Sequence, residues 1–194
     1  LPIDDESIDV AAQNCLFNIF HEDDLKKALN EMYRVLKPRG RLVLSDPIAE
    51  QAMPDSLKYD ERLRALCLSG ALPLDRYIKL ITDAGFGTIE IRAKRPYRIL
   101  DTKNYDTPKS ILIERVEVAA IKDPMPEDGP CVFTGRTAIY TGSKEYFDDH
   151  KGHVLLPNQP LSVCDKTASN LVGLNNEDIW VSESTYFYDG GGCC

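Results

Sequence analysis

The feature that most constrains the fold is a strand–helix–strand pattern within residues 8–46. The apolar run at 8–12 follows a polar turn and is typical of a buried parallel strand. Acidic residues at 22–24 stand where a helix dipole favours anions, and apolar residues then recur at helical spacing. Lys-Pro-Arg-Gly at 37–40 is expected to stop this helix, and the run 41–45 predicts a second strand. Short connections predict a right-handed β-α-β unit of an α/β sheet.

The rest of the chain predicts further regular elements. One helix is expected from residue 54 to Ser69-Gly70, and another over residues 74–84, stopped by Gly85. Residues 88–92 and 111–121 are expected to be strands that form an antiparallel edge pair. Two more strands are expected at 131–140 and 179–188, with a short helix between them that Asp165 caps.

A proline-rich segment at 123–126 marks the boundary that we expect between two units. Residues 1–122 are then one α/β domain, and residues 123–189 a small α+β appendage. The chain ends in Gly190-Gly191-Gly192-Cys193-Cys194, a flexible tail over residues 190–194 that has no apolar side chains to pack.

Charge and hydropathy exclude several classes of partner. The net charge is −8 and the sequence pI is near 4.9, which argues against binding to nucleic acid or to an acidic membrane surface. The densest basic stretch, at 92–98, alternates along an expected strand and is interpreted as a solvated face. No apolar run approaches the roughly 20 residues that span a bilayer.

Six cysteines carry the most reactive chemistry of the chain. They show neither a CxxC pair nor zinc-finger spacing, which is typical of free thiols in a reducing cytosol. Cys15 comes directly after the first expected strand, and ligands of open parallel sheets bind outside the carboxyl ends of strands. Cys131 and Cys164 are interpreted as structural residues. His150 and His153 could form a metal pair, but the Lys-Gly between them favours a plain loop.

Several of these segments together resemble one enzyme family. The turn LKPRGRLVLSD at 36–46 is common among Rossmann-type S-adenosylmethionine-dependent methyltransferases. Asn14-Cys15 and the segment CLSGAL at 67–72 narrow the resemblance to arsenite methyltransferases. The Gly-Cys tail, together with VCDKTA at 163–168, is similar to the cyanobacterial and algal branch linked to arsenosugar formation. The resemblance covers essentially the whole chain.

The resemblance implies a fold, a reaction and a set of residues. The fold is the C-terminal half of a Rossmann-like methyltransferase sheet. Cys15 and Cys67 are the implied catalytic ligands of trivalent arsenic, because thiolates are soft ligands that suit a soft centre. They are expected to be partly accessible, with lowered pKa values, in a longer protein. Asn14 is implied to touch S-adenosylmethionine, a loop-capping role being equally compatible, and Cys193 and Cys194 to capture arsenic. The implied partners are arsenite, methylated arsenicals and a thiol reductant in the cytosol.

The family's glycine-rich cofactor loop, acidic ribose ligand and upstream cysteines all precede the equivalent of Leu1. We therefore expect a C-terminal fragment that is inactive alone. Two alternatives remain open at this point. One is a methyltransferase for a carbon or oxygen of a small organic acceptor, which needs a general base near Cys15, where His21 is the nearby histidine. The other is a non-catalytic thiol module that binds a soft metal or metalloid.

Overall fold

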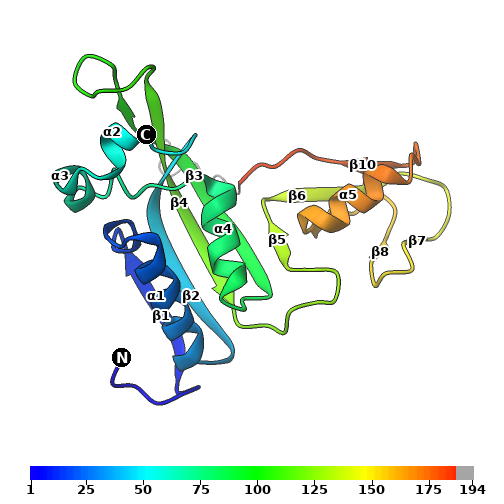
Figure 1. The fold of residues 1–194 in the computed structure, drawn as a ribbon. Helices are drawn as coiled ribbons and strands as arrows, with labels where there is room; N and C mark the ends of the chain where they lie inside the picture. The colour runs from blue at the N-terminus through cyan, green and yellow to red at the C-terminus, as the bar shows by residue number, and fades with distance from the viewer. Residues whose placement is uncertain (187–194) are drawn as a thin grey trace, which may run out of the picture.

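A computed structural model describes residues 1–186, and a five-stranded mixed sheet forms its larger part (Figure 1). The strands of this sheet are β1 (Ile8–Asn14), β2 (Leu36–Ala49), β3 (Thr88–Leu100), β4 (Ile111–Ile121) and β5 (Cys131–Phe133). They lie in the order β1-β2-β4-β3-β5. β1 runs parallel to β2 and β3 parallel to β5, whereas β4 is antiparallel to both of its neighbours. The predicted antiparallel pairing of β3 with β4 is therefore confirmed, but β5 continues the sheet beyond it.

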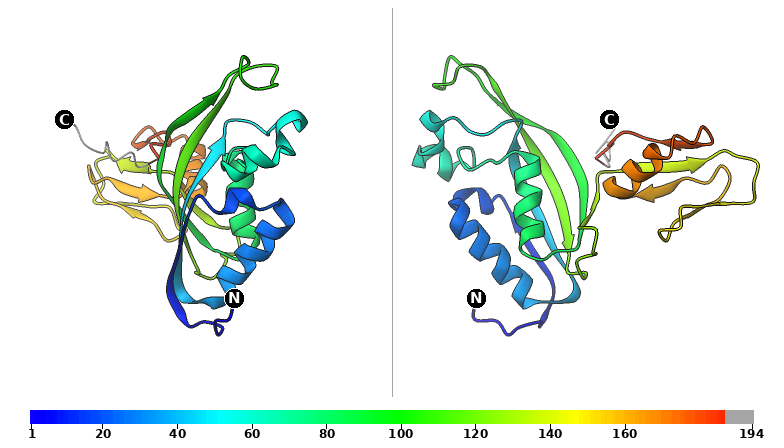
Figure 2. Two further views of the ribbon diagram at one scale, coloured as in Figure 1. Left: turned by 90° about the vertical axis from the view of Figure 1, so that its left-hand side faces the viewer. Right: turned by 45° about the vertical axis from the view of Figure 1, so that its right-hand side comes forward.

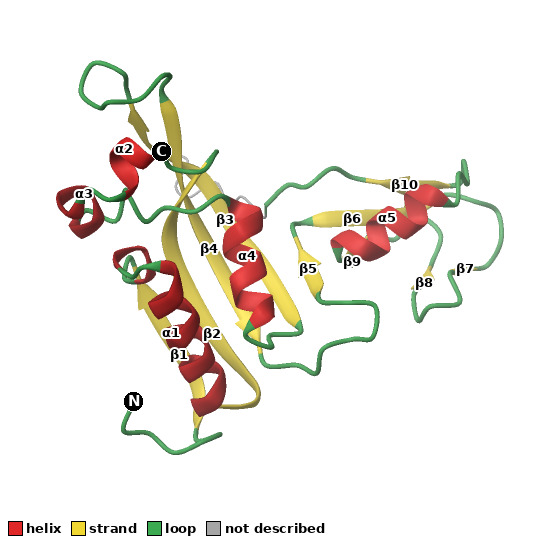
Figure 3. Cartoon of the chain, in the orientation of Figure 1, coloured by secondary structure: helices red, strands yellow, loops and turns green. Residues whose placement is uncertain are grey.

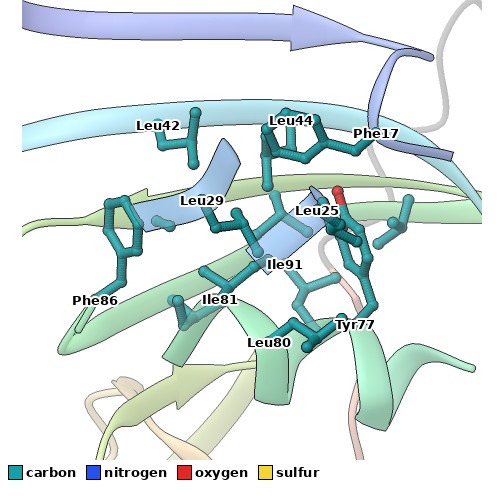
Figure 4. Packing of buried hydrophobic residues seen from close by; sticks show 14 of the residues in the cluster. Phe17, Leu25, Leu29, Leu42, Leu44, Tyr77, Leu80, Ile81, Phe86 and Ile91 are labelled. Atoms are coloured by element: carbon teal, nitrogen blue, oxygen red, sulfur yellow. The ribbon is translucent and has the colours of Figure 1, made fainter. Parts of the chain in front are cut away.

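Two long helices pack on one face of this sheet (Figures 1 and 2). The helical elements of this part are η1 (Phe17–Ile19), α1 (Glu22–Val35), α2 (Asp55–Lys58), α3 (Glu61–Ala65) and α4 (Leu74–Asp83). Figure 4 shows Leu29 of α1 and Ile81 of α4 against Leu42 of β2, all completely buried. Burying the apolar stripes of α1 and α4 on the sheet holds this layer together, since apolar area removed from water supplies the main stabilisation. The predicted parallel β1-α1-β2 unit is confirmed. The expectation that β1 is buried is wrong, because β1 is an edge strand and none of its residues is buried.

Residues 37–40, which were expected to form a turn, are instead part of the first residues of β2. α1 ends at Val35, and β2 already begins at Leu36. The pairing with β1 shifts register between Ile8 and Val10, because Ile8 faces Leu36 and Val10 faces Arg41. Arg39 has a φ of 64°, so the chain makes its bend within an irregular strand entry.

The single helix expected over residues 54–70 is wrong. The structure has two short helices, α2 and α3, separated at Tyr59 and Asp60. The Asp60 carboxylate accepts the backbone amides of Arg62 and Leu63 at 2.8 and 3.0 Å, which starts a new helix. Cys67 consequently lies in the turn beyond α3 and not in a helix.

The strand expected over residues 131–140 divides between two sheets. Gly135, with a φ of 82°, separates β5 from β6, and β6 turns away into a three-stranded sheet of order β10-β6-β9. The second part of the structure consists of β6 (Arg136–Tyr140), β7 (Phe147–Asp148), β8 (Val154–Leu155), β9 (Leu161–Val163), α5 (Asp165–Gly173) and β10 (Ile179–Val181) (Figure 3). β10 is thus shorter than the strand expected at 179–188, whose last two residues lie outside the described part.

The predicted short helix after residue 165 is confirmed, but its cap is not. Cys164 occupies the N-cap position of α5, and Asp165 is the first helical residue. The Asp165 carboxylate instead accepts the hydroxyl of Thr134. β5, which follows the predicted boundary at residue 123, pairs with β3, and the division into two units stays a prediction. Among residues 1–186, no helix has both the length and the apolar content needed to cross a membrane.

Candidate functional site

Cys15 and Cys67 meet at the carboxyl ends of β1 and β2. Cys15 directly follows β1, and its amide donates to the Ser45 carbonyl of β2 at 2.8 Å. Cys67 arrives from the turn after α3, and its thiol donates to the Cys15 carbonyl at 2.9 Å. The two residues are 52 positions apart in the chain. The structure therefore brings together the two thiols that the sequence analysis singled out.

Both cysteines have a backbone conformation that side chains rarely adopt. The φ angle is 55° at Cys15 and 58° at Cys67. The left-handed region disfavours residues with a Cβ, and such strain persists only where the surrounding structure imposes it. The tight loops that carry the thiols are therefore held by their neighbours rather than by local preference.

The two thiols differ in exposure, and burial changes the acidity of Cys67. Cys15 is half-buried, whereas Cys67 is only 6% exposed. Burial raises the pKa of Cys67 to about 12, and the Cys15 thiol and the negative charge of Asp46 act in the same direction. Cys67 is therefore a neutral hydrogen-bond donor at physiological pH. Accessibility and a lowered pKa were expected of a longer protein; in this chain Cys67 shows the opposite of both.

A hollow opens beside Cys15, next to the end of β1. Its volume is about 220 Å³, and its lining comes from β1, β2, β3 and β4. The lining residues are Asn14, Cys15, Ser45, Pro47, Tyr97 and Arg115. Small-molecule sites usually enclose about 300–1,000 Å³. The hollow beside Cys15 is therefore smaller than the usual small-molecule site.

Asn18 is a supporting residue that the sequence analysis missed. Its side chain is buried and donates to the Pro47 carbonyl at 2.6 Å and to the Cys67 carbonyl at 3.3 Å. A Cβ on Gly70 would lie 1.9 Å from the Asn18 carbonyl oxygen, so the two segments touch backbone to backbone. Asn18 and Gly70 thereby clamp the Cys67 turn against the end of β2. The available signal was an amide inside the apolar run at 16–20, since buried amides are normally hydrogen-bonded.

A buried carboxyl group lies close enough to Cys67 to affect its thiol. Asp46, fully buried in β2, accepts hydrogen bonds from the Tyr77 hydroxyl at 2.6 Å and from the Gln13 amide. Its second oxygen is buried without a partner among the described residues. Burial raises the pKa of Asp46, although its hydrogen bonds oppose that shift. The charge of this carboxyl group is one cause of the high pKa of Cys67.

The other candidate residues lie elsewhere. His21 precedes α1, its Nε2 lies 3.8 Å from Glu61, and it does not line the hollow beside Cys15. His150 and His153 each face a different aspartate. Within residues 1–186 no group of three or more His, Cys, Asp or Glu side chains could hold a metal ion. Cys193 and Cys194 lie outside the described residues.

Known proteins similar to this chain are methyltransferases. An arsenite methyltransferase of Halobacterium salinarum is 34% identical over 94 residues, which are 48% of this chain and 24% of that protein. One from Aquipseudomonas alcaligenes is 36% identical over 102 residues, 53% of this chain and 29% of that protein. The chain therefore spans about a quarter of the length of these curated relatives.

A solved structure agrees with this fold. The arsenic(III) S-adenosylmethionine methyltransferase of Chlamydomonas reinhardtii superposes with a TM-score of 0.56 at 23% identity, covering 95% of this chain and 62% of that one. This likeness confirms the Rossmann-like methyltransferase fold. A family model described as a methyltransferase domain matches residues 1–107, more than half of the chain. The strand order, the parallel β1-α1-β2 unit and this match together establish that the chain belongs to the methyltransferase domain family.

Proposed function

We propose that this chain is part of an enzyme that transfers the methyl group of S-adenosylmethionine to trivalent arsenic, and that Cys15 and Cys67 hold the arsenic. The observation that carries the proposal is that the Cys67 thiol contacts the backbone of Cys15, where β1 ends beside β2, and that the Cys15 thiol is near enough to affect it. The relatives named as arsenite methyltransferases support the choice of arsenic as substrate.

The role proposed for this chain is to bind arsenic through its two thiols. Each thiol exchanges a hydroxide of arsenite for its sulfur, its proton leaves with that hydroxide as water, and arsenic stays trivalent. Thiolates are the ligands that a soft centre prefers. Binding at Cys67 breaks the hydrogen bond from its thiol to the Cys15 carbonyl, so the arsenic–sulfur bond must offset this loss. The clamp of Asn18 and Gly70 limits the motion of the Cys67 turn, as a reaction that relies on alignment requires.

The cofactor supplies the methyl group, and this chain supplies one side of its site. Asn14 lines the hollow next to Cys15, which supports our proposal that it faces the cofactor. The hollow is smaller than a usual small-molecule site, so residues beyond its lining complete the proposed cofactor site. Arsenite, methylated arsenicals and a thiol reductant are the proposed partners, in the cytosol, where thiols stay reduced.

The test uses a longer protein that contains this chain. Cys15→Ser and Cys67→Ser are compared with Cys131→Ser and Cys164→Ser, which remove the thiols in β5 and at the N-cap of α5. Serine keeps the size of the side chain and replaces a soft ligand with a hard one. Arsenite binding and the yield of methylated arsenic from labelled S-adenosylmethionine are measured at fixed arsenite.

We expect both site variants to lose arsenite binding and the first methylation, while the two control variants keep the first methylation of arsenite. Nearly full activity of Cys15→Ser and Cys67→Ser would show that these thiols are not the ligands. Methylation of an organic acceptor in place of arsenic would instead favour the alternative methyltransferase.

A further inference from the structure

A second pair of thiols lies at the N-terminal end of α5, away from the hollow beside Cys15. The Lys166 ammonium of α5 donates to the Gly129 carbonyl at 2.7 Å and pairs with Asp128. This contact pins the first turn of α5 to the segment that leads into β5. Cys131 follows Gly129 by two residues and Cys164 precedes Lys166 by two, so the two cysteines flank this contact. The Thr134 hydroxyl, just after β5, also donates to the Asp165 carboxylate next to Cys164, which joins the two segments at a second point. Burial and the neighbouring Cys164 thiol raise the pKa of Cys131, in keeping with this placement.

Cys164 is also the first of a series of polar groups that contact one another. Its sulfur lies 3.3 Å from the Thr167 hydroxyl, which lies 3.4 Å from Nε2 of His153. The other ring nitrogen of His153 lies 2.7 Å from the Asp149 carboxylate. Cys164 and Thr167 are only 4% and 3% exposed, whereas His153 reaches the surface. The hydroxyl and the imidazole therefore offer a path by which the buried thiol can lose its proton.

We propose that Cys131 and Cys164 form a clamp for a monosubstituted trivalent arsenical, a molecule with one organic group and two exchangeable hydroxides on arsenic. Two thiols satisfy such a centre. A caged metal ion needs more ligands, and no such cluster exists among residues 1–186. The choice of arsenic over another soft centre rests on the proposed function.

The binding step is a ligand exchange without redox change. Two arsenic–oxygen bonds and two sulfur–hydrogen bonds break, two arsenic–sulfur bonds form, and two water molecules leave. The proton of Cys164 passes through the Thr167 hydroxyl to His153 and from there to solvent, and the departing hydroxide takes up a proton from solvent to leave as water. The Lys166 ammonium stabilises the Cys131 thiolate while the exchange proceeds.

The test uses the full chain with Cys15, Cys67, Cys193 and Cys194 all replaced by serine, and phenylarsine oxide as the probe. Intact-protein mass spectrometry counts bound phenylarsenic groups after washing with a monothiol. We expect one group per chain, released by the dithiol 2,3-dimercaptopropanol. Adding Cys131→Ser or Cys164→Ser should weaken binding by about a hundredfold, because the second thiol acts at high effective concentration. His153→Gln should slow binding and leave the stoichiometry unchanged.

Three results would overturn the clamp. The first is that the folded four-serine variant retains no phenylarsenic group. The second is that adding Cys131→Ser or Cys164→Ser leaves the retention of phenylarsenic unchanged. The third is a Cys131–Cys164 disulfide that persists under reducing conditions. An unchanged association rate in His153→Gln would refute the proton path. If the four-serine variant does not fold, Cys131→Ser in the otherwise unchanged chain must bind one group fewer than the parent. None of these measurements involves methyl transfer or needs Cys15 and Cys67, so failure of the clamp and failure of the proposed function are distinguishable.

Discussion

Replacing Asn18 with alanine tests whether the Cys67 turn is held by a buried amide. The change removes the donor that serves the Pro47 carbonyl at 2.6 Å and the Cys67 carbonyl at 3.3 Å. Leaving a buried acceptor unpaired costs about 1–3 kcal/mol. The second bond is long and adds little, so we expect the free energy of unfolding to fall by about 1–3 kcal/mol. Urea unfolding of the 194-residue chain, followed by circular dichroism, measures this loss.

The same variant should expose the Cys67 thiol. Releasing the turn breaks the burial that keeps Cys67 at 6% exposure, so its reaction with an aromatic disulfide reagent should accelerate. Asn18→Asp keeps the shape but sets a carboxylate against two carbonyl oxygens, and it should lose more stability than Asn18→Ala. Asn30→Ala, an exposed change in α1, is the matched control. Surface changes usually alter stability by no more than about 0.5 kcal/mol. A change of that size in Asn18→Ala would show that Asn18 does not hold the Cys67 turn.

Four further predictions follow from the same contacts. Gly70→Ala should lower the free energy of unfolding by about 1–3 kcal/mol in urea, because its Cβ would lie 1.9 Å from the Asn18 carbonyl, while Gly173→Ala, with open space around it, should not. As pH rises from about 9 to 12, the unfolded chain releases a Cys67 proton that the folded chain keeps, so the free energy of unfolding should fall more in the parent than in Cys67→Ser. Equal losses of stability in the two proteins would contradict the raised pKa of Cys67. The 194-residue chain alone should not methylate arsenite when given labelled S-adenosylmethionine and a thiol, since the hollow beside Cys15 has less than the roughly 300 Å³ of a usual small-molecule site. Turnover at an enzymatic rate would disprove this. Deleting residues 190–194 from a longer protein should weaken arsenite capture at low concentration but not saturated turnover, and a loss of saturated turnover would place the tail in the active site.

Strong periodicity explains which elements were predictable. α1 and α4 carry apolar residues at helical spacing, and β2 is an apolar run, so local pattern and tertiary burial agree for these three elements. β1 was also predictable as a strand, but it lies at the edge of the sheet and has no buried residue, which its apolar run did not indicate. Prediction failed where one local contact outweighed the pattern. The Asp60 carboxylate starts a second helix and divides the expected helix over 54–70. Gly135 turns the chain between two sheets and divides the expected strand over 131–140.

The candidate site was predictable to a similar degree. Cys15 stands at the end of a recognisable strand, and the motif that begins at Cys67 marks a second thiol, so both could be named in advance. Their contact could not be derived from spacing, because the hydrogen bond joins residues 52 positions apart. The same holds for the amide of Asn18, whose partners lie in two other segments.

The sequence by itself determined the class of the fold, the β1-α1-β2 unit and the thiol chemistry, because these depend on residue type and on neighbours along the chain. Only the tertiary structure decided which thiols meet, which of them is buried and what holds them. Cys131 and Cys164 show this most clearly: nothing in the sequence links them, and it is the Lys166 contact with the Gly129 carbonyl that ties the start of α5 to the segment before β5. Proximity and burial are properties of packing between distant segments, and they set the acidity and reach of a thiol more than its own neighbours do.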